Sequence, residues 1–188
     1  FWGTATSCFK ATVDTAKCSV HNQTATIPVD PNEKGVLNEK FIQPDEILVY
    51  DVHFENVGDV EALDVFVTDQ LDSSLNTSTL QVLSNGTFAY LRSGQTLTLL
   101  ERDKNITQIV GNITINITIH ENWTVSLQGR TINWSLKGIY LLPNQTDTLF
   151  YSIKPLSGLT SGSQIMNNAT IQFEIFSSLT TNQPLNIS

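Results

Sequence analysis

Hydrophobic and polar residues alternate in short runs along most of this chain. Within residues 46–55, Leu48, Tyr50, Val52 and Phe54 occupy every second position. This period predicts a strand with one face in a core and one in solvent, because successive strand side chains point to opposite faces. Similar runs follow at 62–68, 80–83, 87–91, 95–100, 112–120, 123–127, 131–136, 147–153 and 165–175. No stretch keeps a helical period of about 3.6 residues.

Many short strands bounded by Gly, Pro, Asn and Asp predict an all-β fold, an antiparallel sandwich. A chain of 188 residues can form one such domain with a substantial core. Composition shifts little along the chain, so no internal linker is expected. We therefore predict an extended N-terminal segment at 1–29 and a sandwich at 30–188.

Asn-x-Ser/Thr triplets, the acceptor motif of N-glycosylation, are unusually frequent here. The eleven acceptor positions are Asn22, Asn76, Asn85, Asn105, Asn112, Asn116, Asn122, Asn133, Asn144, Asn168 and Asn186. An Asn/Thr-rich composition accounts for a few of them. In most, the middle residue is Ile, Trp or Ala, and on a strand it points opposite to the Asn. We predict that the strand-borne Asn side chains face solvent while the middle residues pack in the core, as at Ile113 and Ile117.

Glycosylation implies an exported protein, extracellular or on the cell surface, that carries covalent N-glycans. The net charge of −8 disfavours a nucleic-acid partner or an anionic membrane, both of which favour basic patches. No apolar run approaches the roughly 18 residues of a membrane-spanning helix, so no membrane span is predicted. Because the chain begins at Phe1, we expect either a removed signal segment or a cut from a longer polypeptide.

The two cysteines, Cys8 and Cys18, lie close together near the N-terminus. Paired cysteines are common in exported proteins, and a disulfide between these two would clamp a hairpin. Two free thiols, or cross-links to a neighbouring subunit, are the alternatives.

The sequence lacks known catalytic motifs, so we do not expect this protein to be an enzyme. The sequence has no Gly-x-Ser-x-Gly elbow, phosphate-binding loop or dinucleotide fingerprint. His21, His53 and His120 lie far apart in sequence, and we interpret them as ordinary strand residues. We interpret Asp69 and Asp72 as part of a turn rather than as a pair of catalytic carboxylates.

No cofactor is expected, with one candidate exception, a structural calcium ion. Hard oxygen ligands cluster at Asp30, Asn32 and Glu33 and again at Asp69 and Asp72. Their spacing matches no EF-hand loop, and Asp-Pro-Asn is also good turn chemistry.

Several segments carry a family resemblance. They are Asp30-Pro-Asn-Glu-Lys34, Phe41-Ile-Gln-Pro-Asp-Glu46, Tyr50-Asp-Val-His-Phe-Glu-Asn56, Val65-Phe-Val-Thr-Asp-Gln-Leu-Asp72, Leu75-Asn-Thr-Ser-Thr-Leu80, Tyr151-Ser-Ile-Lys-Pro155, Gly158-Leu-Thr-Ser-Gly162 and Asn168-Ala-Thr-Ile-Gln-Phe173. Over roughly residues 30–176 the chain resembles the Ig-like "conserved repeat domain" group of secreted and surface proteins of bacteria and archaea. The resemblance implies an Ig-like sandwich in an extracellular stalk, adhesin or assembly, and no activity. The many acceptor triplets, and the cysteine segment outside the match, depart from the family.

These features predict a structural subunit of a glycosylated extracellular filament or surface layer, assembled head to tail from copies of itself. The β-prone ends at 1–13 and 179–187 are candidates for donor-strand complementation, in which one copy adds a strand to the next. The alternative for these ends is pairing within their own sheet. Because sugars cover much of the sandwich, we expect contacts mainly through the first twenty residues.

The alternative function is a monomeric adhesion or carbohydrate-binding module of a larger surface protein. Its exposed aromatics would have to come from Trp2, Trp123 or Trp134. Trp123 and Trp134 occupy the inward positions of their triplets, so core packing is the expected role for both.

Overall fold

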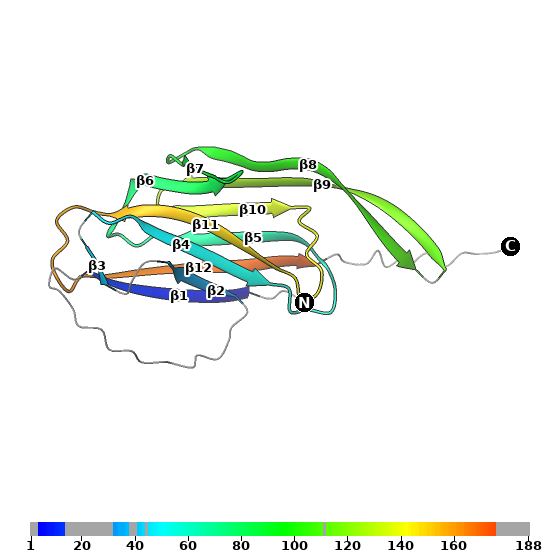
Figure 1. Ribbon diagram of the computed structural model, residues 1–188, viewed down its shortest axis with the longest axis horizontal. Helices are drawn as coiled ribbons and strands as arrows, with labels where there is room; N and C mark the ends of the chain where they lie inside the picture. Colours follow the sequence, from blue (N-terminus) through cyan, green and yellow to red (C-terminus); the bar gives the residue numbers. More distant parts are fainter. Residues whose placement is uncertain (1–3, 14–31, 38–40, 44, 111, 176–188) are drawn as a thin grey trace.

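The computed structural model describes residues 4–13, 32–37, 41–43, 45–110 and 112–175, which form strands and no helix (Figure 1). The strands are β1 Thr4–Val13, β2 Glu33–Val36, β3 Phe41–Ile42, β4 Leu48–Glu55, β5 Ala62–Gln70, β6 Leu75–Ser84, β7 Thr87–Tyr90, β8 Thr96–Val110, β9 Ile113–Gln128, β10 Thr131–Lys137, β11 Thr146–Pro155 and β12 Gln164–Ile175. The two separate strands expected at 112–120 and 123–127 are one continuous strand, β9.

The strands form two sheets. The seven-stranded sheet has the order β3-β1-β12-β5-β10-β9-β8, and the five-stranded sheet has the order β2-β4-β11-β6-β7. Neighbours are antiparallel except for the short parallel pair of β1 and β3. The prediction of an all-β antiparallel sandwich is confirmed.

The core fills the space between the two sheets and follows the alternation seen in the sequence. In β4, Leu48, Tyr50, Val52 and Phe54 are fully buried while the residues between them are half-buried. Core residues on the facing strands β5, β10 and β12 follow the same period of two. Each fully buried side chain of this size stabilises the fold by about 1.5–3 kcal/mol relative to exposure.

The β8–β9 hairpin is much longer than the other hairpins and runs past the end of the sandwich (Figure 1, green). We call residues 105–110 and 112–118 the arm. Ile119, at its base, is 8% exposed, whereas Ile115 is 41% and Ile113 65% exposed. The prediction that the middle residue packs in the core is therefore wrong for Ile113. Its strand has left the region that the five-stranded sheet covers.

The N-terminal strand β1 lies in the seven-stranded sheet. Thr4–Thr12 pair with Gln172–Gln164 of β12 in an unbroken antiparallel register, and the last two residues of β1 pair with β3. Cys8 lies opposite Asn168, but Cys18 is outside the described residues and so is the predicted disulfide. The predictions for Trp2, His21, Asn22, Asn186 and 179–187 also lie outside the described residues.

Candidate functional site

A polar cluster is buried between the sheets. Lys34 on β2 belongs to the five-stranded sheet, whereas Asp69 on β5 and Asn167 on β12 belong to the seven-stranded sheet. The Lys34 ammonium forms an ion pair with Asp69 Oδ2, and neither side chain is exposed at all. Taking two charges out of water is costly, so such a pair requires close hydrogen-bond partners.

The Asn167 amide supplies those partners. Its oxygen and nitrogen are assigned from the neighbouring donors and acceptors. In that orientation Nδ2 donates to Asp69 Oδ1 at 3.0 Å and to the Gln70 carbonyl at 2.8 Å, while Oδ1 accepts from Lys34 Nζ at 2.9 Å. The amine, the carboxylate and the amide therefore contact one another within a closed triangle.

Aromatic rings enclose the triangle. Tyr50 and Tyr151 stack with their centroids 5.0 Å apart, and Lys34 Nζ lies 4.9 Å and 5.3 Å from these two centroids. The Tyr151 hydroxyl lies 2.9 Å from Asp69 Oδ2 and 2.6 Å from the Asn167 amide, so it shares one proton between two acceptors. Trp134 also packs against Tyr151, with 5.9 Å between the ring centroids.

The protonation of the cluster reflects its burial. Loss of hydration raises the pKa of Asp69, while the charge of Lys34 acts in the opposite direction. Burial and the Asp69 carboxylate raise the pKa of both Tyr50 and Tyr151, so neither ring ionises at neutral pH. The net effect is a raised pKa for the Asp69 carboxyl group, so it binds a proton more readily than an exposed Asp.

Sequence reasoning missed this cluster, although a signal was present. Asp69 falls at an inward position after Val65 and Val67, and Asn167 falls between Ile165 and Ala169, so the strand period places each polar side chain in the core. A polar residue at an inward position requires a partner. The pattern does not identify that partner, because Lys34 comes from the opposite sheet.

The candidate calcium ligands do not come together among the described residues. Asp69 binds Lys34, while the carboxylate of Asp72 accepts from the backbone N–H groups of Ser74 at 2.7 Å and Met166 at 2.9 Å. Asn32 is buried just before β2, where it accepts from the N–H of Glu55 at 3.3 Å, and Glu33 is exposed.

Within the described ranges, no group of three or more His, Cys, Asp and Glu is placed to hold a metal ion. Asp30 lies outside these ranges, so calcium binding stays a prediction.

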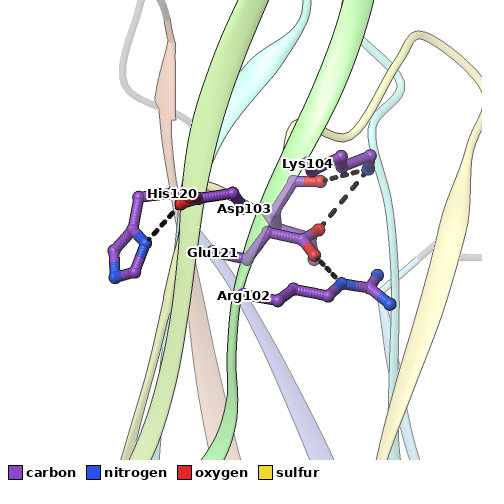
Figure 2. Close-up of polar contacts among 6 residues, drawn as sticks. Arg102, Asp103, Lys104, His120 and Glu121 are labelled. Carbon is purple, nitrogen blue, oxygen red and sulfur yellow. Dashed lines mark hydrogen bonds and ion pairs between the residues drawn. The ribbon is translucent and has the colours of Figure 1, made fainter.

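A second polar cluster marks the base of the arm (Figure 2). Glu121 is 1% exposed on the inner face of β9, where Arg102 Nε binds its Oε2 and Lys104 Nζ lies 3.5 Å from its Oε1. On the opposite face His120 Nδ1 lies 2.9 Å from Asp103 Oδ1. Lys104 also donates to the Ile139 carbonyl at 3.3 Å.

These contacts join the two strands of the hairpin to the loop after β10 and form one wall of an open cleft. They hold the base of the arm against the sandwich. The two described histidines do not meet, since His53 contacts Thr148 Oγ1 in the five-stranded sheet at 3.0 Å and His120 lies on β9 of the other sheet.

The described acceptor triplets are arranged by face. None of their nine Asn residues is buried. Five of them lie within strands of the seven-stranded sheet, and the register places these on its outer face, away from the core; they are Asn105, Asn116, Asn122, Asn133 and Asn168. Asn112 is exposed in the turn before β9, and Asn76, Asn85 and Asn144 lie elsewhere. The outer face of the seven-stranded sheet therefore carries five of the nine described acceptor positions.

The middle residues of two triplets meet the core as expected. Trp134 is 2% exposed and Ala169 is fully buried, while Trp123 is partly buried and packs against the core. The prediction of a core role for Trp123 and Trp134 is therefore confirmed.

Fold and site together define a two-sheet β-sandwich with a projecting hairpin and a charged cluster in its core. Residues 30–117, a little under half of the chain, match the model of a family described as a domain of unknown function, DUF7619. This match covers β2 to β8 and the start of β9. No curated protein and no solved structure is significantly similar to the chain. None of the described segments is a helix long and apolar enough to cross a membrane.

Proposed function

We propose that this protein is a structural subunit of a glycosylated extracellular filament or surface layer in which copies of the chain contact one another head to tail. The observation that supports this most is the arm, whose two faces differ in chemistry. One face carries acceptor triplets, and the other carries isoleucines without a covering sheet.

The triplet face of the arm is polar and hydrogen-bonded across the two strands. Thr118 Oγ1 donates to Asn105 Oδ1 at 2.8 Å, and Thr107 Oγ1 donates to Asn116 Oδ1 at 2.9 Å. All four side chains are exposed, so glycans attached to the two Asn residues would extend into solvent. Bulky glycans on this face would keep it from docking flat against another protein.

The isoleucine face continues the inner, core-facing side of the seven-stranded sheet. The register pairs Ile106 with Ile117, and Ile113 and Ile115 follow on the same face of β9. In the sandwich this side packs against the five-stranded sheet. On the arm Ile113 and Ile115 are exposed, and Ile106 and Ile117 are half-buried. Apolar sheet faces of this kind are stabilised by a second layer. A neighbouring copy of the chain supplies that layer in the proposed assembly.

The N-terminal strand supports the same assembly by a second route. β1 adds an unbroken ladder to β12. Its covalent connection to the next strand, β2, runs through residues 14–32. A strand attached through such a long connection can form the same ladder with the next copy, which is strand exchange. Because the donor and acceptor surfaces differ, the contact does not close and propagates a fibre.

The arm is tested by charge substitutions on its two faces. Ile113→Asp together with Ile115→Asp should abolish polymers seen by electron microscopy, because two carboxylates cannot be buried without partners. Ile109→Asp is the matched control, since Ile109 is 75% exposed but lies opposite Thr114 on the triplet face. Normal polymers from the double variant would refute the role of the arm. Loss of polymers in the Ile109→Asp control would show that the effect is not specific to the isoleucine face.

The strand is tested by deleting residues 1–13. We expect folded, glycosylated monomers or dimers in place of fibres. Intact fibres would exclude strand exchange through β1 and leave the C-terminal segment at 179–187 as the remaining donor.

A monomeric carbohydrate-binding module is the second candidate, and one surface feature favours it. Phe88 and Tyr90 are 42% and 53% exposed on the edge strand β7, and the Arg92 guanidinium lies 4.7 Å from the Tyr90 ring centroid. Exposed aromatics on one strand can stack on sugar rings. Saturable binding on a glycan array that is lost in Tyr90→Ala would support this function, and the absence of any binder would count against it.

A further inference from the structure

The buried cluster places three complementary reactive groups in contact within a dry core. Lys34 offers an amine, Asn167 a primary amide and Asp69 a carboxyl group that touches both. The amine nitrogen lies 2.9 Å from the amide oxygen, which is bonded to the carbon that a nucleophile would attack. Proximity of this kind replaces the entropy cost of bringing two reactants together.

From this geometry we infer that Lys34 and Asn167 form an intramolecular isopeptide bond that joins β2 to β12, with Asp69 as the group that transfers the protons. This is a modification site in the core of the sandwich, and it does not depend on the proposed filament function.

The reaction balances without any further reactant. A proton passes from the Lys34 ammonium to Asp69 Oδ2, which leaves a neutral amine. The Nζ lone pair then attacks the Asn167 carbonyl carbon, and a tetrahedral intermediate forms. The Asp69 acid delivers its proton to Nδ2, and the carboxylate so formed takes the remaining excess proton from Nζ, so the C–N bond to Nδ2 breaks. The products are one secondary amide and one ammonia molecule, and no atom is oxidised or reduced.

Each neighbour favours this chemistry over a static ion pair. Full burial of Lys34 and Asp69 destabilises their charged forms relative to the neutral amine and acid. Asn167 Nδ2 donates to Asp69 Oδ1, so the carboxyl group that becomes the proton donor already lies beside the leaving group. Tyr151 O–H lies 2.6 Å from the amide oxygen, where negative charge develops in the transition state. Tyr50 and Tyr151 exclude the water that would otherwise compete as a nucleophile.

The position of the bond has a structural consequence. Lys34 lies in β2 of the five-stranded sheet. Asn167 lies in β12, the last strand along the described chain, which belongs to the seven-stranded sheet. The bond would tie the two sheets together and enclose nearly the whole sandwich in one covalent loop.

Mass spectrometry of the full 188-residue chain tests the inference directly. The chain is produced in a host without N-glycosylation and reduced before measurement, so that sugars and disulfides do not change its mass. The wild-type mass should fall below the sequence mass by one ammonia, about 17 Da, as expected when a nucleophile displaces an amine from an amide. Trypsin should no longer cut after Lys34, and fragment spectra should show one peptide that carries both Lys34 and Asn167.

Three variants and one control assign the roles. Lys34→Met and Asn167→Leu should restore the full mass, because each removes one reactant. Asp69→Asn should also restore it while keeping the size of the side chain. Lys104→Met is the control, since Lys104 also contacts a buried carboxylate, Glu121, but should keep the loss of ammonia.

A folded wild-type chain with full mass and no linked peptide would overturn the inference and leave a non-covalent polar cluster. Loss of ammonia in Asp69→Asn would overturn the role of Asp69. If the variants fail to fold, the linked peptide in the wild-type digest still decides the question.

Discussion

Among the described glycines, Gly138 has the least room for a side chain. Its φ of 69° lies in the left-handed region, and its N–H donates to Asp64 Oδ1 at 2.7 Å. A Cβ at this position would lie 2.4 Å from the His120 carbonyl oxygen and 2.9 Å from Ile119 Cγ2. Neither atom is the end of a flexible side chain, so the backbone at the base of the arm would have to move.

Gly138→Ala should therefore lower the free energy of unfolding by about 2–4 kcal/mol, through both strain and collision. Gly94→Ala is the matched control, because its φ is 78° but nothing lies within 4 Å of the added Cβ. The control should cost only about 1–2 kcal/mol, the usual penalty of a left-handed alanine. Urea denaturation of both variants measures the difference, and equal costs would contradict the account of Gly138.

At the residue scale, the sequence predicts which positions are inward but not which side chains meet. The inward positions of Trp134 and Ala169 follow from the strand period alone. The ion pair of Lys34 with Asp69 does not, because the two residues come from different sheets and approach only when the sheets pack. The same limit explains why Asp69 was expected among calcium ligands: its carboxylate chemistry was visible in the sequence, and its neighbour was not.

In the β8–β9 hairpin, the local pattern of alternating residues predicts a strand but not which of its residues are buried. Isoleucines alternate with polar residues from Ile113 to Ile119, and nothing in that pattern changes along the strand. The exposed fraction of the side chain nevertheless falls from 65% at Ile113 to 8% at Ile119. The cause is the extent of the opposite sheet, which is a property of other segments. The strand was therefore predictable, and the arm was not.

This burial gradient predicts that the arm contributes little to the stability of the sandwich. Replacing residues 106–117 by a short glycine-containing turn should change the free energy of unfolding by less than about 1 kcal/mol, because few core contacts are lost. Ile119→Ala, at the buried base, should instead cost about 2–4 kcal/mol through the cavity that it leaves. Thermal and urea unfolding of the two variants make the comparison. A large loss of stability on shortening the arm would show that its isoleucines pack against the same molecule.

The order of strands in the sheets is the feature of the whole molecule that the sequence predicts least. The first strand lies beside the last, and β5 lies between β12 and β10. Alternation is identical for any order of the strands, so it identifies the two-layer architecture and leaves the pairing open. Pairing depends on which edges meet once both layers close over the core. The match of β1 with β12 is thus a structural finding, and it determines which surface a chain without its first strand would expose.

A chain without residues 1–13 should expose the β12 edge and bind the missing strand when it is added separately. The test uses a synthetic peptide of residues 4–13 with Cys8→Ser, because backbone groups form the ladder of Thr4–Thr12 with Gln172–Gln164. We expect saturable one-to-one binding and a melting temperature of the truncated chain that rises with peptide concentration, since the ligand binds only the folded form. A scrambled peptide of the same composition is the control, and the intact chain should bind the β1 peptide more weakly because its own β1 competes for the site. Equal binding of the scrambled peptide would show that the contact is not the β1 ladder. Failure of the peptide to bind a folded truncated chain would mean that β1 cannot be donated between copies.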